Sequence, residues 1–227
     1  MIPLRDINPR RTPPVVNTAL IVINVLFFLW ELSLGPELQA ALMKYAFIPA
    51  RFSTPGYGGG MQTVFISMFL HGGWLHLAGN MLYLWIFGDN IEDRLGHAKY
   101  LFFYLACGVI ATYTHAFMNL GSRLPSIGAS GAIAGVLGAY IVLFPTARVM
   151  TFIPIGFFLA MRELPALLVL GFWFVMQLFV GVTSLHTVNP QDMGGVAYFA
   201  HIGGFVAGVI LVLMLGGRRA DGTHPRF

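Results

Sequence analysis

The sequence predicts an all-α membrane protein in which six transmembrane helices form one bundle. Hydrophobic residues make up 57% of its 227 residues and charged residues only 10%, whereas a soluble domain carries about 25% charged residues. The mean hydropathy is +0.75, and apolar stretches of about 20 residues, the length that crosses a bilayer, recur along the chain. A chain with so few charges cannot cover its own surface in water, so lipid is the solvent that fits it.

The predicted spans are separated by polar, glycine-containing or proline-containing segments. They are residues 16–34, 62–88, 98–118, 127–144, 164–182 and 196–215. The third and fifth spans are rich in Phe, Leu, Val and Tyr, which favours contact with lipid, whereas the fourth and sixth are dense in Gly and Ala. Residues 35–61 are too polar to span, but apolar residues recur there at helical spacing, which predicts an amphipathic segment at the membrane interface.

The domain organisation that follows is simple. We expect a short cytoplasmic segment over residues 1–15, a single six-helix membrane domain over 16–215 and a short cytoplasmic tail over 216–227. The first apolar stretch ends at Trp30 and Glu31 without a small-residue cleavage site, which predicts a retained span and not a removed signal peptide.

The distribution of basic residues predicts the orientation. An even number of spans places both termini on one side of the membrane, and that side then carries ten Lys and Arg residues against three on the other. The ten are Arg5, Arg10, Arg11, Arg94, Lys99, Arg148, Arg162, Arg218, Arg219 and Arg226, and the three are Lys44, Arg51 and Arg123. Because basic loops stay inside, we expect a multi-pass protein of the cell membrane, plasma or inner, with both termini cytoplasmic.

Composition also excludes several kinds of partner. The net charge is +4, but no Lys/Arg cluster is interleaved with aromatic residues, so nucleic acid is not predicted as a partner. Cys107 is the only cysteine, which leaves no intrachain disulfide and no cysteine-rich metal site. His71 and His76 are five residues apart, so they do not share a helical face, and no carboxylate stands beside them. We therefore expect no metal and no cofactor, and a lipid bilayer as surroundings.

Polar residues inside apolar spans are costly and indicate function. Ser130 begins the fourth predicted span, His201 lies near the start of the sixth, and His71, His76 and Asn80 lie in the first part of the second. In the predicted topology all five fall in the outer half of the bilayer. The sequence therefore predicts that they converge in depth.

Glycine patterns predict that Ser130 and His201 also meet laterally. The fourth and sixth spans each carry glycines four residues apart, namely Gly131 with Gly135 and Gly204 with Gly208. Such pairs let two helix backbones approach closely. His201 shares a face with the glycines of its own span, and Ser130 directly precedes those of the other. If the two faces pack, the imidazole reaches the hydroxyl.

These two residues can form a catalytic dyad. A serine hydroxyl is a weak nucleophile until a base takes its proton, and histidine suits that role because its pKa lies near neutrality. The productive separation is about 2.6–3.2 Å. Asp192 lies in the preceding loop, and Asp89 and Asp93 lie at the opposite end of their span, so a carboxylate as third member is not predicted.

An acyl-transfer site also needs donors where negative charge develops. His76 and Asn80 are four residues apart on one helical face, and the backbone N–H of Ser130 lies at a helix N-terminus. Together they would form an oxyanion hole. Gly128 and Gly131 would let a peptide backbone lie against the serine without a Cβ clash.

Each residue alone also has a structural interpretation, and these stay open. Ser130 fits helix packing, His201 fits a backbone-bonded histidine or a proton relay, and Asn80 fits interhelical bonding. Gln177 needs a partner because it is an amide inside a predicted span. Glu92 and Arg94 lie far from the dyad and fit an ion pair that stabilises a turn.

The motifs together resemble the rhomboid family of intramembrane serine proteases. The resemblance runs over residues 62–215 and is carried by "HGGWLHLAGN", "GASG", "AHIGG" and "EDR". It implies a rhomboid-like six-helix bundle with a hydrophilic cavity that opens outward, no cofactor, and a Ser130–His201 dyad without an acid. It assigns the oxyanion hole to His76, Asn80 and the Ser130 N–H and a structural role to His71, with Gly128, Gly131 and Gly204 in support.

The resemblance also implies a function, with two departures from the family pattern. The implied reaction is cleavage of single-pass transmembrane proteins near the outer membrane face. Ala134 stands where some relatives carry a tyrosine that stacks on the histidine, and the loop around Arg51 lacks the Trp-Arg pair of other members.

Other functions remain as alternatives. They are a non-catalytic binder or chaperone of transmembrane helices, a small transporter, and a lipid-directed acyl hydrolase. No paired halves with interrupted helices, typical of a transporter, stand out in the sequence.

Overall fold

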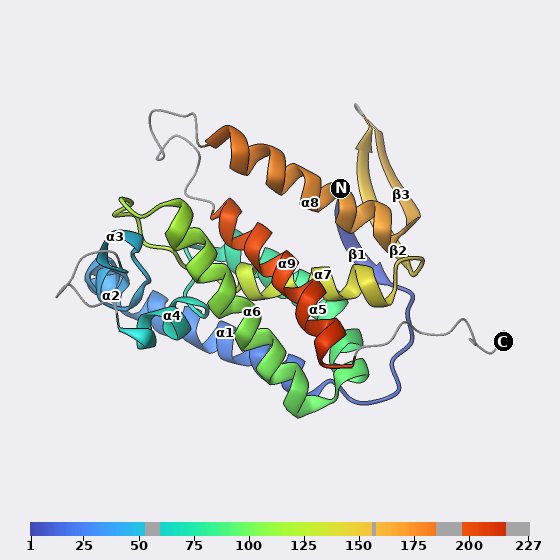
Figure 1. Cartoon of the computed structure of the whole chain (residues 1–227), viewed down its shortest axis with the longest axis horizontal. Helices are drawn as coiled ribbons and strands as arrows, with labels where there is room; N and C mark the ends of the chain where they lie inside the picture. The colour runs from blue at the N-terminus through green and yellow to red at the C-terminus, as the bar shows by residue number, and fades with distance from the viewer. Residues whose placement is uncertain (53–59, 156–157, 185–196, 217–227) are drawn as a thin grey trace.

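Most of the chain in this computed structural model is helical (Figure 1). The structure describes residues 1–52, 60–155, 158–184 and 197–216. The helices are α1 Val15–Ser33, η1 Gly35–Glu37, α2 Leu38–Tyr45, α3 Pro49–Phe52, α4 Met61–Ser67, α5 Trp74–Leu95, α6 His97–Met118, α7 Ser130–Leu143, α8 Ala166–Ser184 and α9 Tyr198–Met214. The strands are β1 Ile2–Asp6, β2 Arg148–Ile155 and β3 Phe158–Pro165. Asp192 and residues 217–227 of the predicted tail lie outside the described residues.

The helices fit a membrane protein. Within the described ranges, α1, α6 and α8 are long and apolar enough to cross a bilayer, and α7 and α9 are shorter apolar helices. α5 has 22 residues, the same length as α6, but its last turns carry Asp89, Glu92, Asp93 and Arg94. The predicted helical membrane protein is therefore confirmed, and the number of six spans stays a prediction.

The stretch 62–88, predicted as a second span long enough to include flanking turns, contains two helices separated by a break. The chain forms α4, then six residues without regular helix, and only then α5 at Trp74. Gly73 precedes α5 with a φ of 153°, a conformation that residues with a Cβ rarely adopt. The pair Gly72–Gly73 breaks the helix inside an apolar stretch, so hydropathy alone does not reveal the break.

The fold is mostly helical, as predicted, but it also contains a small sheet that an all-α fold lacks. The three strands form an antiparallel sheet in the order β1-β2-β3, with Ile2 opposite Phe152 and Val149 opposite Leu164. Val149 and Thr151 are fully buried and alternate with partly buried Met150, which is the period-two pattern of a half-buried strand. This sheet packs where α8 begins, at the end of the bundle that holds the N-terminus (Figure 1).

The core of the bundle is centred on α7. Eleven of its fourteen residues are buried, and it packs against α5, α6, α8 and α9. A Cβ added at Gly208 would clash with the backbone of Gly135, and one at Gly204 would clash with the carbonyl of Gly131. The backbones of α7 and α9 therefore touch directly, as expected from the glycine pairs.

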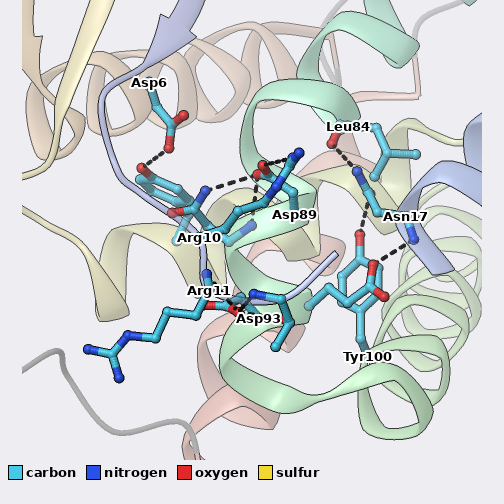
Figure 2. A network of polar contacts seen from close by, with 12 residues as sticks. Asp6, Arg10, Arg11, Asn17, Leu84, Asp89, Asp93 and Tyr100 are labelled. Carbon is cyan, nitrogen blue, oxygen red and sulfur yellow. Dashed lines mark hydrogen bonds and ion pairs between the residues drawn. The ribbon is translucent and has the colours of Figure 1, made fainter. Parts of the chain in front are cut away.

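An ion pair and hydrogen bonds join the N-terminal segment to the last turns of α5 (Figure 2). Arg10 pairs with Asp89 at 2.9 Å, and Asp93 accepts the backbone N–H and the hydroxyl of Thr12 at 2.7 and 2.6 Å. Glu92 is fully buried and accepts the N–H groups of Val16 and Asn17 at 2.9 and 2.7 Å. These contacts place the start of α1 against α5.

Glu92 has a further partner in the ring of His97, whereas the Arg94 guanidinium lies over the ring of Phe144. The buried Glu92 carboxylate thus caps the start of another helix. The predicted ion pair between Glu92 and Arg94 stays a prediction.

Candidate active site

Ser130 and His201 meet where α7 and α9 begin. Ser130 is the first residue of α7, and His201 lies in the first turn of α9. The Ser130 Oγ and the His201 Nε2 are 2.8 Å apart, within the range at which a base can take the hydroxyl proton. Ser130 is half-buried and His201 is 9% exposed.

Small residues make this close approach possible. A Cβ added at Gly131 would lie 2.6 Å from the Cβ of Ala111 and 3.8 Å from atoms of Ala200, the residue before His201. A Cβ at Gly204 of α9 would collide with the Gly131 carbonyl of α7, so a larger residue there would move α9, and with it the His201 ring, away from Ser130. Gly131 and Gly204 therefore position the pair without touching it.

The second ring nitrogen of His201 also has a partner. Its Nδ1 lies 2.7 Å from the side-chain carbonyl oxygen of Gln177, on α8. The ring of Trp173, one turn earlier on α8, lies 5.8 Å from the imidazole centroid at an interplanar angle of 37°. Ala134 offers no aromatic contact, and Trp173 supplies one from another helix. The sequence marked Gln177 only as an amide in need of a partner and gave Trp173 no role at the site.

His76 and Asn80 line the same site from the first turns of α5. Gly128 has a φ of 123°, and a Cβ there would lie 2.8 Å from the Cε1 and Nε2 of His76 and 3.7 Å from the Nδ2 of Asn80. Any larger residue would be strained and would collide with the His76 ring. The predicted site residues from α5, from the turn before α7 and from α9 are thus brought together.

His71 lies just before α5 and holds Asn80. The His71 Nδ1 is 3.1 Å from the Phe69 carbonyl, which can only accept, so Nδ1 carries the proton. The Nε2 then accepts one amide hydrogen of Asn80, at 3.0 Å. A primary amide has two such hydrogens, so the second is available to another acceptor.

Glu31 supports this arrangement, and sequence reasoning missed it. Its two carboxylate oxygens lie 3.2 and 3.0 Å from the backbone nitrogen of His71, and its side chain is 2% exposed. An acidic residue near the end of an apolar stretch was a signal that could have found it. Glu31, His71 and Asn80 form one chain of hydrogen bonds from α1 to α5.

A cavity of about 720 Å³ surrounds these groups. Its wall includes the four side chains of Ser130, His201, His76 and Asn80, together with Trp173. His115 of α6 also lines it, although its position at a span end gave no reason to expect it there. A nucleophile, a base and amide and imidazole groups that can donate hydrogen bonds therefore face one space large enough for part of a peptide. Such a set can perform acyl transfer.

Comparisons with known proteins agree with this arrangement. A family model described as the Rhomboid domain matches residues 58–218. The mitochondrial presenilin-associated rhomboid-like protein of Homo sapiens is 34% identical over 155 residues, which cover 66% of this chain and 39% of that protein. The mitochondrial rhomboid protein 1 of Saccharomyces cerevisiae is 30% identical over 197 residues, covering 85% and 51%. The rhomboid protease GluP of Bacillus subtilis is 29% identical over 216 residues, covering 94% and 37%.

This chain therefore spans about half or less of the length of these relatives. The matched region contains α4 to α9, and with them Ser130, His201 and the residues that hold them. The family model matches well over half of this chain. The chain belongs to the rhomboid family.

Proposed function

We propose that the chain is an intramembrane serine endopeptidase that cleaves single-pass transmembrane proteins near the outer face of the membrane. The observation that carries the proposal is the 2.8 Å separation of the Ser130 Oγ and the His201 Nε2 inside a cavity lined by His76 and Asn80. Membership of a family that includes a protein named as a protease, GluP, supports it.

The proposed reaction begins at the Ser130 hydroxyl. Its Oγ attacks the carbonyl carbon of the scissile peptide bond while the proton passes to the Nε2 of His201. The negative charge on the carbonyl oxygen is stabilised by His76, by the second amide hydrogen of Asn80 and by the backbone N–H of Ser130. When the tetrahedral intermediate collapses, His201 gives its proton to the leaving amine. A water molecule then releases the acyl group by the same steps, with His201 again the base.

The substrate segment must be extended at the cleavage point. In a helix the peptide N–H and carbonyl groups are bonded to one another, so a carbonyl inside an intact turn is shielded from the hydroxyl. Glycine at positions 128 and 131 leaves room beside Ser130 for a bare peptide backbone. A transmembrane segment that unwinds easily near its end is the substrate class that fits this site.

The proposal includes the six spans and the orientation. α5, α7 and α9 join α1, α6 and α8 as spans, both termini lie in the cytoplasm, and the cavity opens to the opposite side of the cell membrane. The separation of the dyad from the basic and acidic residues of the N-terminal segment and the end of α5 supports this arrangement.

The test is cleavage of a single-pass transmembrane substrate by the purified chain in liposomes. Ser130→Ala and His201→Ala are expected to abolish cleavage and labelling by a fluorophosphonate probe. Asn80→Ala is expected to lower kcat by about 10²- to 10³-fold, the usual effect of losing one oxyanion donor. Ser33→Ala is the matched control, because Ser33 is exposed and bonds only the turn before it.

Two outcomes contradict the proposal. Folded Ser130→Ala protein that cleaves at the normal rate would show that another group is the nucleophile. Unlabelled, inactive wild-type protein that still binds transmembrane peptides would favour the alternative function, a binder of transmembrane helices.

A further inference from the structure

We infer that Gln177 is a positioning residue that fixes the tautomer of His201 and so prepares the dyad for proton transfer. This inference rests on the proposed function. It gives the catalytic pair a neutral third member, in the place where other serine hydrolases carry a carboxylate.

The direction of the two hydrogen bonds carries the inference. The partner of the His201 Nδ1 is the Oε1 of Gln177, at 2.7 Å, and an amide oxygen can only accept. The proton of the neutral ring therefore sits on Nδ1. The Nε2 is left with its lone pair directed at the Ser130 Oγ, 2.8 Å away, which is the tautomer that a base for Ser130 needs.

Three helices supply the three hydrogen-bonded residues. Ser130 comes from α7, His201 from α9 and Gln177 from α8. The ring of Trp173 limits rotation of the imidazole from the α8 side, while the amide fixes which nitrogen faces the serine. α8 thus contributes an amide and an indole contact to the base, and α7 contributes the nucleophile.

An amide suits this position better than a carboxylate. A charged side chain on a transmembrane helix is costly unless it is paired with another charge or in contact with water. Gln177 is only half-buried, and the neighbouring side chains Met176 and Leu178 are exposed on the surface of α8. The other titratable groups that line the cavity within the described residues are His76 and Tyr83 from α5, His115 from α6 and Tyr198 from α9. No Asp or Glu of the described residues lines the cavity, and the partner of the His201 Nδ1 there is a neutral amide.

A purely structural role for Gln177 is the competing explanation. In that case the amide would only join α8 to α9, and its loss would change stability without a specific effect on proton transfer. The two explanations differ in how the reaction depends on pH and in which kinetic constant changes.

The experiment compares Gln177→Leu and Gln177→Glu with the wild type. Leucine is close in size and removes the acceptor, so kcat and the rate of fluorophosphonate labelling at Ser130 are expected to fall at least about tenfold with KM unchanged. Glutamate keeps an oxygen acceptor at the same distance and is expected to recover activity. Its carboxylate also favours the imidazolium, which cannot accept a proton, so the acid limb of the profile of kcat/KM against pH moves to higher pH. Met176→Leu, at the adjacent exposed position, is the matched control and is expected to behave as the wild type.

Wild-type kcat and an unchanged pH profile in Gln177→Leu would overturn the inference. So would Gln177→Glu protein as impaired as Gln177→Leu with the acid limb unmoved, because that result indicates a structural role. The proposed function fails separately: it falls if the wild type neither labels at Ser130 nor cleaves. If cleavage requires Ser130 and His201 but is indifferent to position 177, only the inference falls.

Discussion

The two ends of α5 differ in how their polar side chains are used. At its start, His76 and Asn80 face a cavity, and Asn80 uses one of its two amide hydrogens on His71. At its end, Asp89, Glu92 and Asp93 are bonded to the N-terminal segment and to the start of α1 (Figure 2). One end therefore keeps polar groups available, and the other uses them within the fold.

The hydrogen bonds at the end of α5 fix the position of the whole helix. They therefore also fix where His76 and Asn80, at its start, face the cavity. The first N–H groups of a helix have no partners within it, and Glu92 supplies a negative acceptor for two of those of α1. The Asn17 side-chain oxygen accepts a hydrogen bond from the Tyr100 hydroxyl at 2.7 Å, and its amide nitrogen donates one to the Leu84 carbonyl at 3.0 Å. This network joins α1, α5 and α6 at one level. At the other end of α5, hydrogen bonds from the His71 backbone N–H to Glu31 and from Asn80 to His71 hold the residues that line the cavity.

Removing Glu92 is expected to give the largest effect on stability. Glu92→Leu leaves the N–H groups of Val16 and Asn17 buried without an acceptor, and each such donor costs about 1–3 kcal/mol. We expect a loss of about 3 kcal/mol in the free energy of unfolding, measured by denaturant titration in detergent. Activity would be lost only in proportion to the unfolded fraction.

Glu37→Leu is the matched control, because Glu37 is exposed in η1, and its effect is expected to stay within about 0.5 kcal/mol. If Glu92→Leu were equally mild, the network at the end of α5 would not be what holds the helix.

Two glycines on α5 give a sharper comparison with a smaller effect. A Cβ at Gly88 would clash with the Asn17 side chain and lie 2.7 Å from the hydroxyl of Tyr100, whereas a Cβ at Gly79 has nothing within 4 Å. Gly88→Ala is therefore expected to destabilise the protein by about 1–3 kcal/mol, as overpacking does. Gly79→Ala is expected to be neutral or to stabilise it by up to about 1 kcal/mol, because alanine is the better helix former.

The same unfolding titration measures both variants. Equal effects at the two positions would mean that the crowding around Gly88 relaxes without cost. A destabilised Gly79→Ala protein would contradict the open space around Gly79 at the cavity end of α5.

The dyad could be predicted because its signals are local. Ser130 and His201 stand out as polar groups beside glycine pairs in apolar helices, and such pairs predict which faces touch. His76 and Asn80 follow from helical spacing once α5 is recognised. Each of these inferences uses residues a few positions apart.

The parts that sequence could not predict depend on long-range geometry or on competition between patterns. Gln177 lies 24 positions from His201 in the sequence. The rotation of α8 that directs Gln177 toward His201 cannot be read from the hydrophobic periodicity of α8 itself. Glu31 reaches His71 across 40 positions. The strands β2 and β3 were missed because residues 148–165 are mostly apolar and adjoin a predicted span, so hydropathy masked their alternation.

The smallest expected effect concerns Asp6, a partly buried carboxylate that lies near α5. Asp6 accepts the Tyr140 hydroxyl at 2.7 Å, but burial dominates and raises the pKa of Asp6 to about 6, with the nearby charge of Asp89 adding to the rise. A carboxyl whose pKa is higher in the folded than in the unfolded state binds its proton more tightly when folded. Its contribution to stability is therefore complete below about pH 4 and is lost as the pH rises through about 6.

Asp6→Asn keeps an oxygen to accept the hydrogen bond from the Tyr140 hydroxyl and cannot titrate, so its Tm is expected to fall less than that of the wild type between pH 4 and pH 7. Thermal unfolding of both proteins across that range measures the difference, and parallel curves would mean that burial of Asp6 does not raise its pKa.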